Sequence, residues 1–162
     1  MLSQPDILFL FNLAGKCRLM KTLLEKLHYK NQPRIAVINP DNCPELLKVP
    51  ELKDVKIDTE IDQRYPYQFM IMFVKNVSEV KKLAPLALHN LVDDGVLWFC
   101  YPKKTSKRQA SDIDRDHGWN VLQDHGFYGI RMVSVNDKWS ALRFRHKKYI
   151  KATSARFRNQ KN

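Results

Sequence analysis

The chain has 162 residues, of which 44% are apolar and 28% are charged. This composition is typical of one soluble globular domain and excludes collagen-like and low-complexity chains. Three cysteines (Cys17, Cys43 and Cys100) are odd in number and widely spaced, so they do not predict a disulfide framework. The net charge of +11 is the one extreme value.

The excess positive charge lies in two segments. Residues 103–108 carry four lysines and arginines, and residues 143–162 carry eight, and neither segment contains an acid. The rest of the chain holds 16 basic and 17 acidic residues. A localised basic surface attracts nucleic acid, acidic proteins or anionic lipid. The alternative interpretation is a solvated tail that aids solubility.

No membrane span or secretory leader is predicted. The apolar run 7–13 follows Pro5-Asp6 rather than basic residues, no A-x-A site follows it, and it is far shorter than the roughly 20 residues that cross a bilayer. We therefore expect a cytoplasmic protein.

The first elements along the chain alternate between helix and strand. Apolar spacing predicts an amphipathic helix over 16–27, and β-branched residues predict a core strand over 34–39. Asn42 is the expected N-cap of a short helix reaching Val49, with Pro44 just inside it. Alternating apolar and polar residues predict a half-covered strand over 55–61.

The pattern at the centre of the chain predicts a βαβ unit. Residues 67–74 and 96–101 are almost wholly apolar, which indicates parallel strands covered on both faces. Between them we expect a helix capped by Ser78, kinked or split at Pro85, and ended by residues 93–95.

The remaining elements are a helix and a hairpin. A helix is expected over 112–124 with Gly126 as its stop, followed by antiparallel strands over 128–135 and 139–145. The predicted organisation is an N-terminal extension, one α/β domain and a basic C-terminal tail, over residues 1–15, 16–146 and 147–162.

This order of elements resembles the second half of the class I methyltransferase sheet, with 34–39 and 56–61 as an abbreviated first half. The resemblance implies a mainly parallel Rossmann-like sheet with helices on both faces and a C-terminal antiparallel hairpin. Several motifs within residues 21–145 also resemble a small bacterial domain-of-unknown-function family. They are Asp94-Gly95-Val96-Leu97-Trp98, Tyr101-Pro102-Lys103-Lys104-x-Ser106, Asp116-x-x-Trp119 and Trp139-Ser140-Ala141-Leu142-Arg143-Phe144-Arg145.

The turn after the first strand departs from the methyltransferase pattern. Residues 39–44 contain two prolines and no glycine, whereas that family uses glycine to let the backbone approach its cofactor. No cofactor is therefore predicted, and tight binding of S-adenosylmethionine is not expected. Glu60 and Asp62 are the candidates for the acid that holds ribose hydroxyls, although carboxylates are common at strand ends.

No catalytic or metal-binding residues are predicted. The five histidines lack ligand spacing, and no G-x-S-x-G elbow is present. Asp116-His117 is the nearest approach to an acid/base pair, but adjacent helical side chains diverge. Trp98, Trp119 and Trp139 are expected to pack the core.

Two candidate binding sites remain. Lys103, Lys104 and Ser106 leave the carboxyl end of a buried strand, where open α/β sheets bind ligands, and Arg115 follows in the first turn of the next predicted helix. We expect an anion there, held by the lysines and the helix N-terminus, unless the loop is only a solvated connection. The predicted nucleic-acid contacts are Arg143, Arg145, Lys147, Lys148, Lys151, Arg156 and Arg158.

The favoured hypothesis is a non-catalytic basic module that binds a polyanion, nucleic acid or an acidic partner. One alternative is a divergent transferase that acts on a small anionic ligand on a methyltransferase-like scaffold. Another is an accessory protein whose tail docks on an acidic partner.

Overall fold

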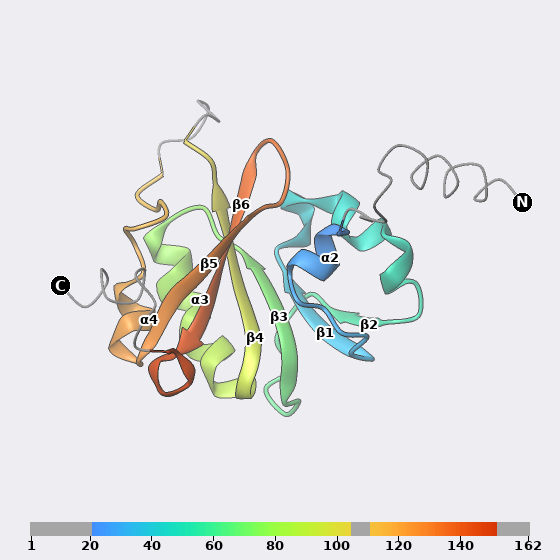
Figure 1. Ribbon diagram of the computed structural model, residues 1–162, viewed down its shortest axis with the longest axis horizontal. Coiled ribbons are helices and arrows are strands. Elements are labelled where there is room, and N and C mark those ends of the chain that lie inside the picture. The colour runs from blue at the N-terminus through green and yellow to red at the C-terminus, as the bar shows by residue number, and fades with distance from the viewer. Residues whose placement is uncertain (1–20, 105–110, 152–162) are drawn as a thin grey trace, which may run out of the picture.

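A six-stranded sheet forms the centre of the described chain (Figure 1). The computed structural model describes residues 21–104 and 111–151. The sheet order is β2-β1-β3-β4-β6-β5. Its strands are β1 (Arg34–Ile38), β2 (Lys56–Asp58), β3 (Tyr67–Phe73), β4 (Leu91–Pro102), β5 (Phe127–Ser134) and β6 (Trp139–His146). The first four pair in parallel, and β6 runs antiparallel to both β4 and β5, which confirms the predicted architecture.

Both faces of the central strands are covered. Phe69, Ile71, Phe73, Leu97 and Phe99 are each at most 1% exposed, as their continuous apolar runs predict. The helices α3 (Val77–Asn90) and α4 (Asn120–Asp124) cover one face, and α2 (Leu23–Lys26) lies over the other (Figure 1). All three tryptophans pack in the core, as expected.

In the described part of the chain, the predicted 16–27 helix is represented by the short helix α2. Of the expected 16–27 helix, the part before residue 21 lies outside the described residues, and α2 begins only after Thr22. Thr22 is extended, its hydroxyl accepts from the Glu25 backbone N–H, and the Glu25 carboxylate accepts from the Thr22 N–H. This capping box starts the helix at a point that apolar spacing does not reveal.

Prolines divide the connection between β1 and β2. Three short 3₁₀ turns (Pro40–Asn42, Pro44–Lys48 and Pro50–Leu52) replace the predicted helix, and Cys43 rather than Asn42 precedes the second turn. Each turn begins at a proline, which suits the first helical position, and the next proline along the chain prevents the first two turns from joining into a longer helix. The second strand, Lys56–Asp58, covers only the first half of the predicted 55–61 segment.

Helix α3 continues through Pro85 as one helix, so the expected split into two segments is wrong. Pro85 removes the ladder bond to the Lys81 carbonyl, but both residues are exposed, so water can satisfy that oxygen. The helix starts after Asn76, whose side chain accepts from the Glu79 N–H, rather than at Ser78.

Residues 93–95 do not end the helix but form a bulge inside β4. The ladder pairs Tyr67 with Leu91 and then Phe69 with Val96, so the residues of β4 between these pairs leave the ladder. Asp94 has a φ of 53°, in the left-handed region. The bulge brings the Asp93 and Asp94 side chains to the amino end of β4.

Helix α4 is much shorter than the predicted 112–124 helix. Residues before Asn120 instead form turns in which the Asp114 carboxylate accepts from the backbone N–H groups of Asp116 and His117. Aspartate competes for backbone donors in this way and favours turns over helix. Gly126, with a φ of 82°, follows the helix as expected, and the hairpin of β5 and β6 matches its prediction.

Candidate functional site

The loop after β4 meets the turns before α4 around an open hollow of about 420 Å³. Lys103, Lys104 and Arg115 all line it, so the structure brings together three of the four predicted anion-binding residues. The fourth, Ser106, lies outside the described residues.

Acids and hydroxyls already occupy part of this basic hollow. Lys103 donates to the Ser134 hydroxyl at 2.7 Å, and the Lys104 ammonium lies 3.3 Å from Asp114. Burial opposes ionisation of Asp114, yet hydrogen bonds from the Asp116 N–H, His117 and Lys104 lower its pKa to about 2. The expected contribution of a helix N-terminus is wrong, because α4 begins well after Arg115.

His117 pairs with Asp114 rather than with its neighbour Asp116. Its Nδ1 lies 2.8 Å from Asp114 Oδ1, and the side chain is 78% exposed. The i, i+3 contact follows from the turn, which the sequence does not predict. Because the His117 imidazole is so exposed to water, His117 and Asp114 do not form a desolvated acid/base pair.

The basic C-terminal segment separates into two groups. Arg143 and Arg145 are half-buried in β6, whereas Lys147, Lys148 and Lys151 are exposed after it. Arg145 makes two hydrogen bonds of 2.7 Å with Asp94. The predicted contacts Arg156 and Arg158 lie outside the described residues.

Basic groups cluster around His28, and no sequence pattern predicts this cluster. Arg131 Nη1 lies 3.0 Å from His28 Nε2, and Arg143 Nη1 lies 3.4 Å from His28 Nδ1. The pKa of His28 is lowered by burial, then by the charges of Arg143 and Arg131. Residues more than 100 positions apart form this cluster, so no local pattern reveals it.

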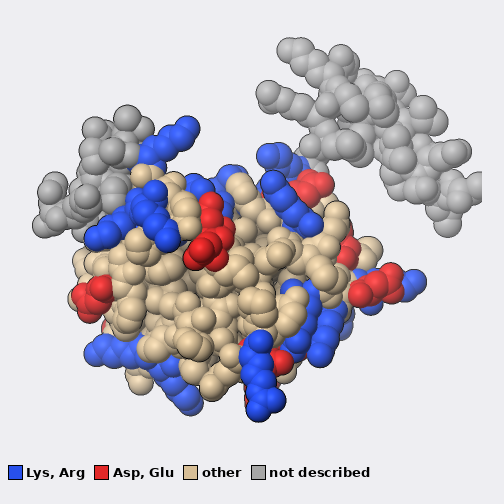
Figure 2. All heavy atoms as spheres, turned by 90° about the horizontal axis from the view of Figure 1, so that it is seen from below, with Lys and Arg blue, Asp and Glu red and all other residues tan. Residues whose placement is uncertain are grey.

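The basic loop at Lys103 and the basic segment after β6 lie at opposite ends of the strands β4 and β6. Antiparallel pairing places Pro102 beside Trp139 and Leu97 beside Phe144, so Lys103 lies near the start of β6, whereas Lys147 lies beyond its end. Viewed from below, Lys and Arg side chains form separate groups around a broad uncharged area (Figure 2). The positive charge is therefore not one continuous face in this view.

A second hollow, of about 570 Å³, lies at the carboxyl ends of β1 and β2, where Rossmann-like folds bind ligands. Glu60 lines it, whereas Asp62 accepts from Arg34 at 2.9 Å. Asn39 takes the left-handed conformation at the turn, with a φ of 57°, and donates to the Phe73 carbonyl at 2.9 Å. An asparagine followed by Pro40 thus occupies the turn where methyltransferases carry glycine.

Among the solved structures that resemble this chain is a candidate type 11 methyltransferase from Sulfolobus solfataricus. It is 12% identical, covers 82% of this chain and 94% of its own, and has a TM-score of 0.50. An rRNA methylase from Streptococcus thermophilus is 8% identical, with coverages of 80% and 99% and a TM-score of 0.48. The fold is methyltransferase-like. At such low identity the similarity extends to the fold alone.

No protein-family model and no curated protein sequence matches the chain, so its resemblance to a bacterial domain-of-unknown-function family stays a prediction. Among the described residues, no group of His, Cys, Asp and Glu side chains is arranged to hold a metal ion. None of the helices in residues 21–104 and 111–151 has the length and apolar character to cross a membrane.

Proposed function

We propose that the chain is a non-catalytic module that binds nucleic acid through the basic segment after β6. One observation carries the proposal. Lys147, Lys148 and Lys151 are exposed at the end of the sheet, and none of the acids in the described part of the chain forms an ion pair with them. Uncompensated lysines attract phosphates and release the counterions around them.

The backbone that carries these lysines is ordered by local contacts. The 3₁₀ turn Lys147–Tyr149 follows His146, whose Nδ1 accepts from the Lys148 N–H at 3.2 Å. The Lys147 N–H donates to the Gly126 carbonyl at 2.8 Å, which ties the turn to the end of α4. Lys147 and Lys148 lie on this anchored turn, so they lose less conformational entropy on binding than the same groups on a free chain would.

The loop around Lys103 and Lys104 supplies a second, separate anion contact in this proposal. Because it lies at the opposite end of the strands β4 and β6, one short strand of nucleic acid does not need both surfaces. We therefore assign the nucleic-acid affinity to the segment after β6 and a single small anion to the loop.

A divergent transferase is the second candidate function. It rests on the hollow at the carboxyl ends of β1 and β2, which Glu60 and Lys82 line. The fold leaves this end of the strands open for a ligand. The turn at Asn39 lacks the glycine that lets the backbone approach a cofactor, so we favour the binding module over the transferase.

Salt-dependent binding of the full chain tests the proposed function. The probe is a fluorescent single strand or duplex, and the variant is Lys147→Gln/Lys148→Gln/Lys151→Gln. Loss of three phosphate contacts is expected to reduce the slope of log K against log salt by about 2 to 3. The matched control, Lys53→Gln/Lys56→Gln/Lys81→Gln, removes the same charge from exposed lysines elsewhere.

Equal slopes in the two triple variants would contradict the proposal, as would no binding by the intact protein at about 50 mM salt. Polyglutamate provides a further arm. If it competes as effectively as nucleic acid of equal charge, the partner is an acidic protein instead.

A further inference from the structure

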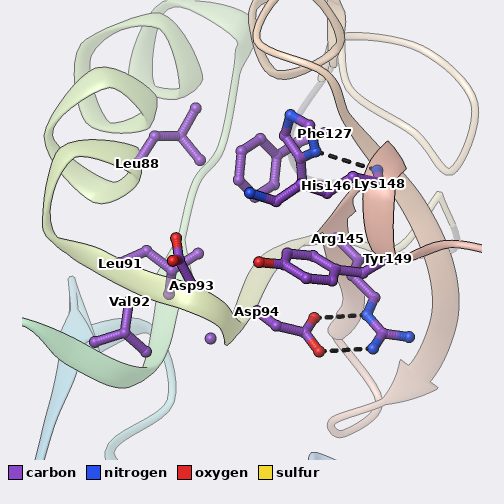
Figure 3. A pocket seen from close by; sticks show the side chains of 11 residues that line it. Leu88, Leu91, Val92, Asp93, Asp94, Phe127, Arg145, His146, Lys148 and Tyr149 are labelled. Carbon is purple, nitrogen blue, oxygen red and sulfur yellow. Dashed lines mark hydrogen bonds and ion pairs between the residues drawn. The ribbon is translucent and has the colours of Figure 1, made fainter.

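A small hollow of about 200 Å³ lies at the amino end of β4, beside the lysine-bearing turn (Figure 3). The hollow lies at the opposite end of the parallel strands from the loop of Lys103 and from the hollow at Asn39. Its walls come from the end of α3, the bulge of β4, the start of β5 and the turn after β6.

The hollow has two apolar walls. Leu88 and Leu91 form one of them, and the rings of Phe127 and Tyr149 lie across from these leucines (Figure 3). Phe127 also packs edge-on against the His146 ring, with centroids 5.3 Å apart. Apolar side chains facing aromatic rings across a narrow space suit a flat, apolar ligand.

Glycines allow these walls to approach one another. A Cβ on Gly126 would lie 2.8 Å from His146 Nε2, and a Cβ on Gly95 would lie 2.7 Å from Leu91 Cδ1. Any larger residue at either position would push the His146 ring or the Leu91 side chain out of place. The shape of the hollow is therefore determined by backbone that approaches side chains closely.

The charges around the hollow cancel. Arg145 is neutralised by its two hydrogen bonds with Asp94, and the remaining ionised groups are Asp93 and Lys148, one of each sign. A neutral lining favours an uncharged ligand over a phosphate or an ammonium group.

Polar groups at the rim are available for a ligand. Asp93 is exposed, and its carboxylate accepts no hydrogen bond within the described residues. The Asp93 carboxylate and the Tyr149 hydroxyl both face the hollow (Figure 3). The Lys148 ammonium lies 5.0 Å from the Tyr149 ring centroid. With Lys148 left to the phosphates, the acceptor carboxylate and the hydroxyl, which both donates and accepts, match the mixed donor and acceptor edge of a nucleobase.

We propose that this hollow holds one unpaired base of a single-stranded nucleic acid whose phosphates contact Lys147, Lys148 and Lys151. The inference rests on the proposed function and names its substrate class. A paired base exposes neither its faces nor its pairing edge, so a duplex can fill the hollow only by flipping a base out. Because Asp93 accepts hydrogen bonds, adenine, cytosine and guanine, which carry amino groups, bind more tightly than thymine, whose single N3–H donor lies between two carbonyl oxygens that repel a carboxylate.

The test compares strands of about ten nucleotides that carry either cytosine or only abasic sites, at equal salt and equal charge. The intact protein is expected to bind the cytosine strand about 5- to 150-fold more tightly than the abasic strand, the range for one stacked base. Asp93→Ala should reduce this ratio and abolish the preference for cytosine over thymine strands. Asp54→Ala, which removes an equally exposed carboxylate, should leave both unchanged.

A second variant, Leu88→Trp, fills the hollow without altering charge. It should bring the cytosine-to-abasic ratio close to one while leaving the salt slope of the abasic strand unchanged, and its melting temperature checks that it folds. The Lys147/Lys148/Lys151 triple variant should do the reverse, lowering the slope for every strand.

The outcomes separate the two proposals. If the intact protein binds both strands equally while the lysine variant still lowers the slope, the base pocket is wrong and the proposed function stands. If no strand binds at about 50 mM salt, both are wrong. Saturable binding of free cytidine without any preference between strands would assign the hollow to a nucleoside instead.

Discussion

Arg145 donates from Nε and Nη2 to the two carboxylate oxygens of Asp94, and both hydrogen bonds are 2.7 Å long. The contact joins the end of β6 to the bulge in β4 and lowers the pKa of Asp94, chiefly through the hydrogen bonds from Arg145. Arg145, a predicted nucleic-acid contact, is thereby engaged within the protein itself. Among the predicted contacts that the structure describes, the lysines after β6 are the exposed ones.

Breaking this pair should cost measurable stability. We expect a double-mutant cycle of Asp94→Asn and Arg145→Gln to give a coupling of about 0.5–1 kcal/mol in urea unfolding, because the geometry is bidentate but both side chains are partly exposed. Asparagine tolerates the left-handed backbone at Asp94, so the cycle reports the charge pair rather than strain. The Arg115 and Asp116 pair, separated by 3.7 Å and more than half exposed, is the control and should show almost no coupling. Equal couplings in the two cycles would contradict the assignment.

His28 should make stability depend on pH. Its pKa is lowered from the ordinary value of 6.5, so the unfolded chain binds a proton more readily than the folded chain. The free energy of unfolding should therefore fall as pH drops below about 6.5 and stop changing above it. His28→Asn, which suits the φ of 63°, should remove this part of the pH dependence. His89→Gln changes an exposed histidine and should retain it; loss of the dependence in both variants would exclude His28 as its source.

The loop hollow should bind a single small anion. Phosphate or sulfate is expected to raise the melting temperature of the intact protein by mass action, and the rise should be smaller in Lys103→Ala/Lys104→Ala. Asp114→Asn provides the opposite change, because it releases the Lys104 ammonium from its ion pair and should enlarge the anion-dependent rise. Equal shifts in intact protein and the double-alanine variant would mean that the loop is only a solvated connection.

S-adenosylmethionine should show no saturable heat in calorimetry at about millimolar concentration, because the turn at Asn39 and Pro40 lacks the glycines that allow close backbone approach. Adenosine and S-adenosylhomocysteine serve as parallel ligands. A micromolar dissociation constant, lost on Glu60→Ala, would support the transferase alternative and assign the ligand to the hollow at β1 and β2.

Elements whose signal is local and continuous could be predicted from the sequence alone. The apolar runs of β3 and β4 predict buried parallel strands, and the polar residues between β5 and β6 predict their hairpin. Both signals depend on residues close in the chain, which is why the existence of these strands and their membership in the core follow from them. The exposed positive charge after β6 was evident for the same reason, since no acid follows Arg143.

The folded structure adds the points at which the helices start, through caps that are themselves local, and the pairs that charged side chains form. Thr22 and Asn76 start their helices through side-chain caps, and the Asp114 turn replaces two turns of predicted helix. The pairing of Arg145 with Asp94 joins residues 51 positions apart, and it exists because the bulge of β4 turns an aspartate toward the neighbouring strand. Such contacts depend on the register of the sheet, and register is a property of packed strands rather than of any one segment.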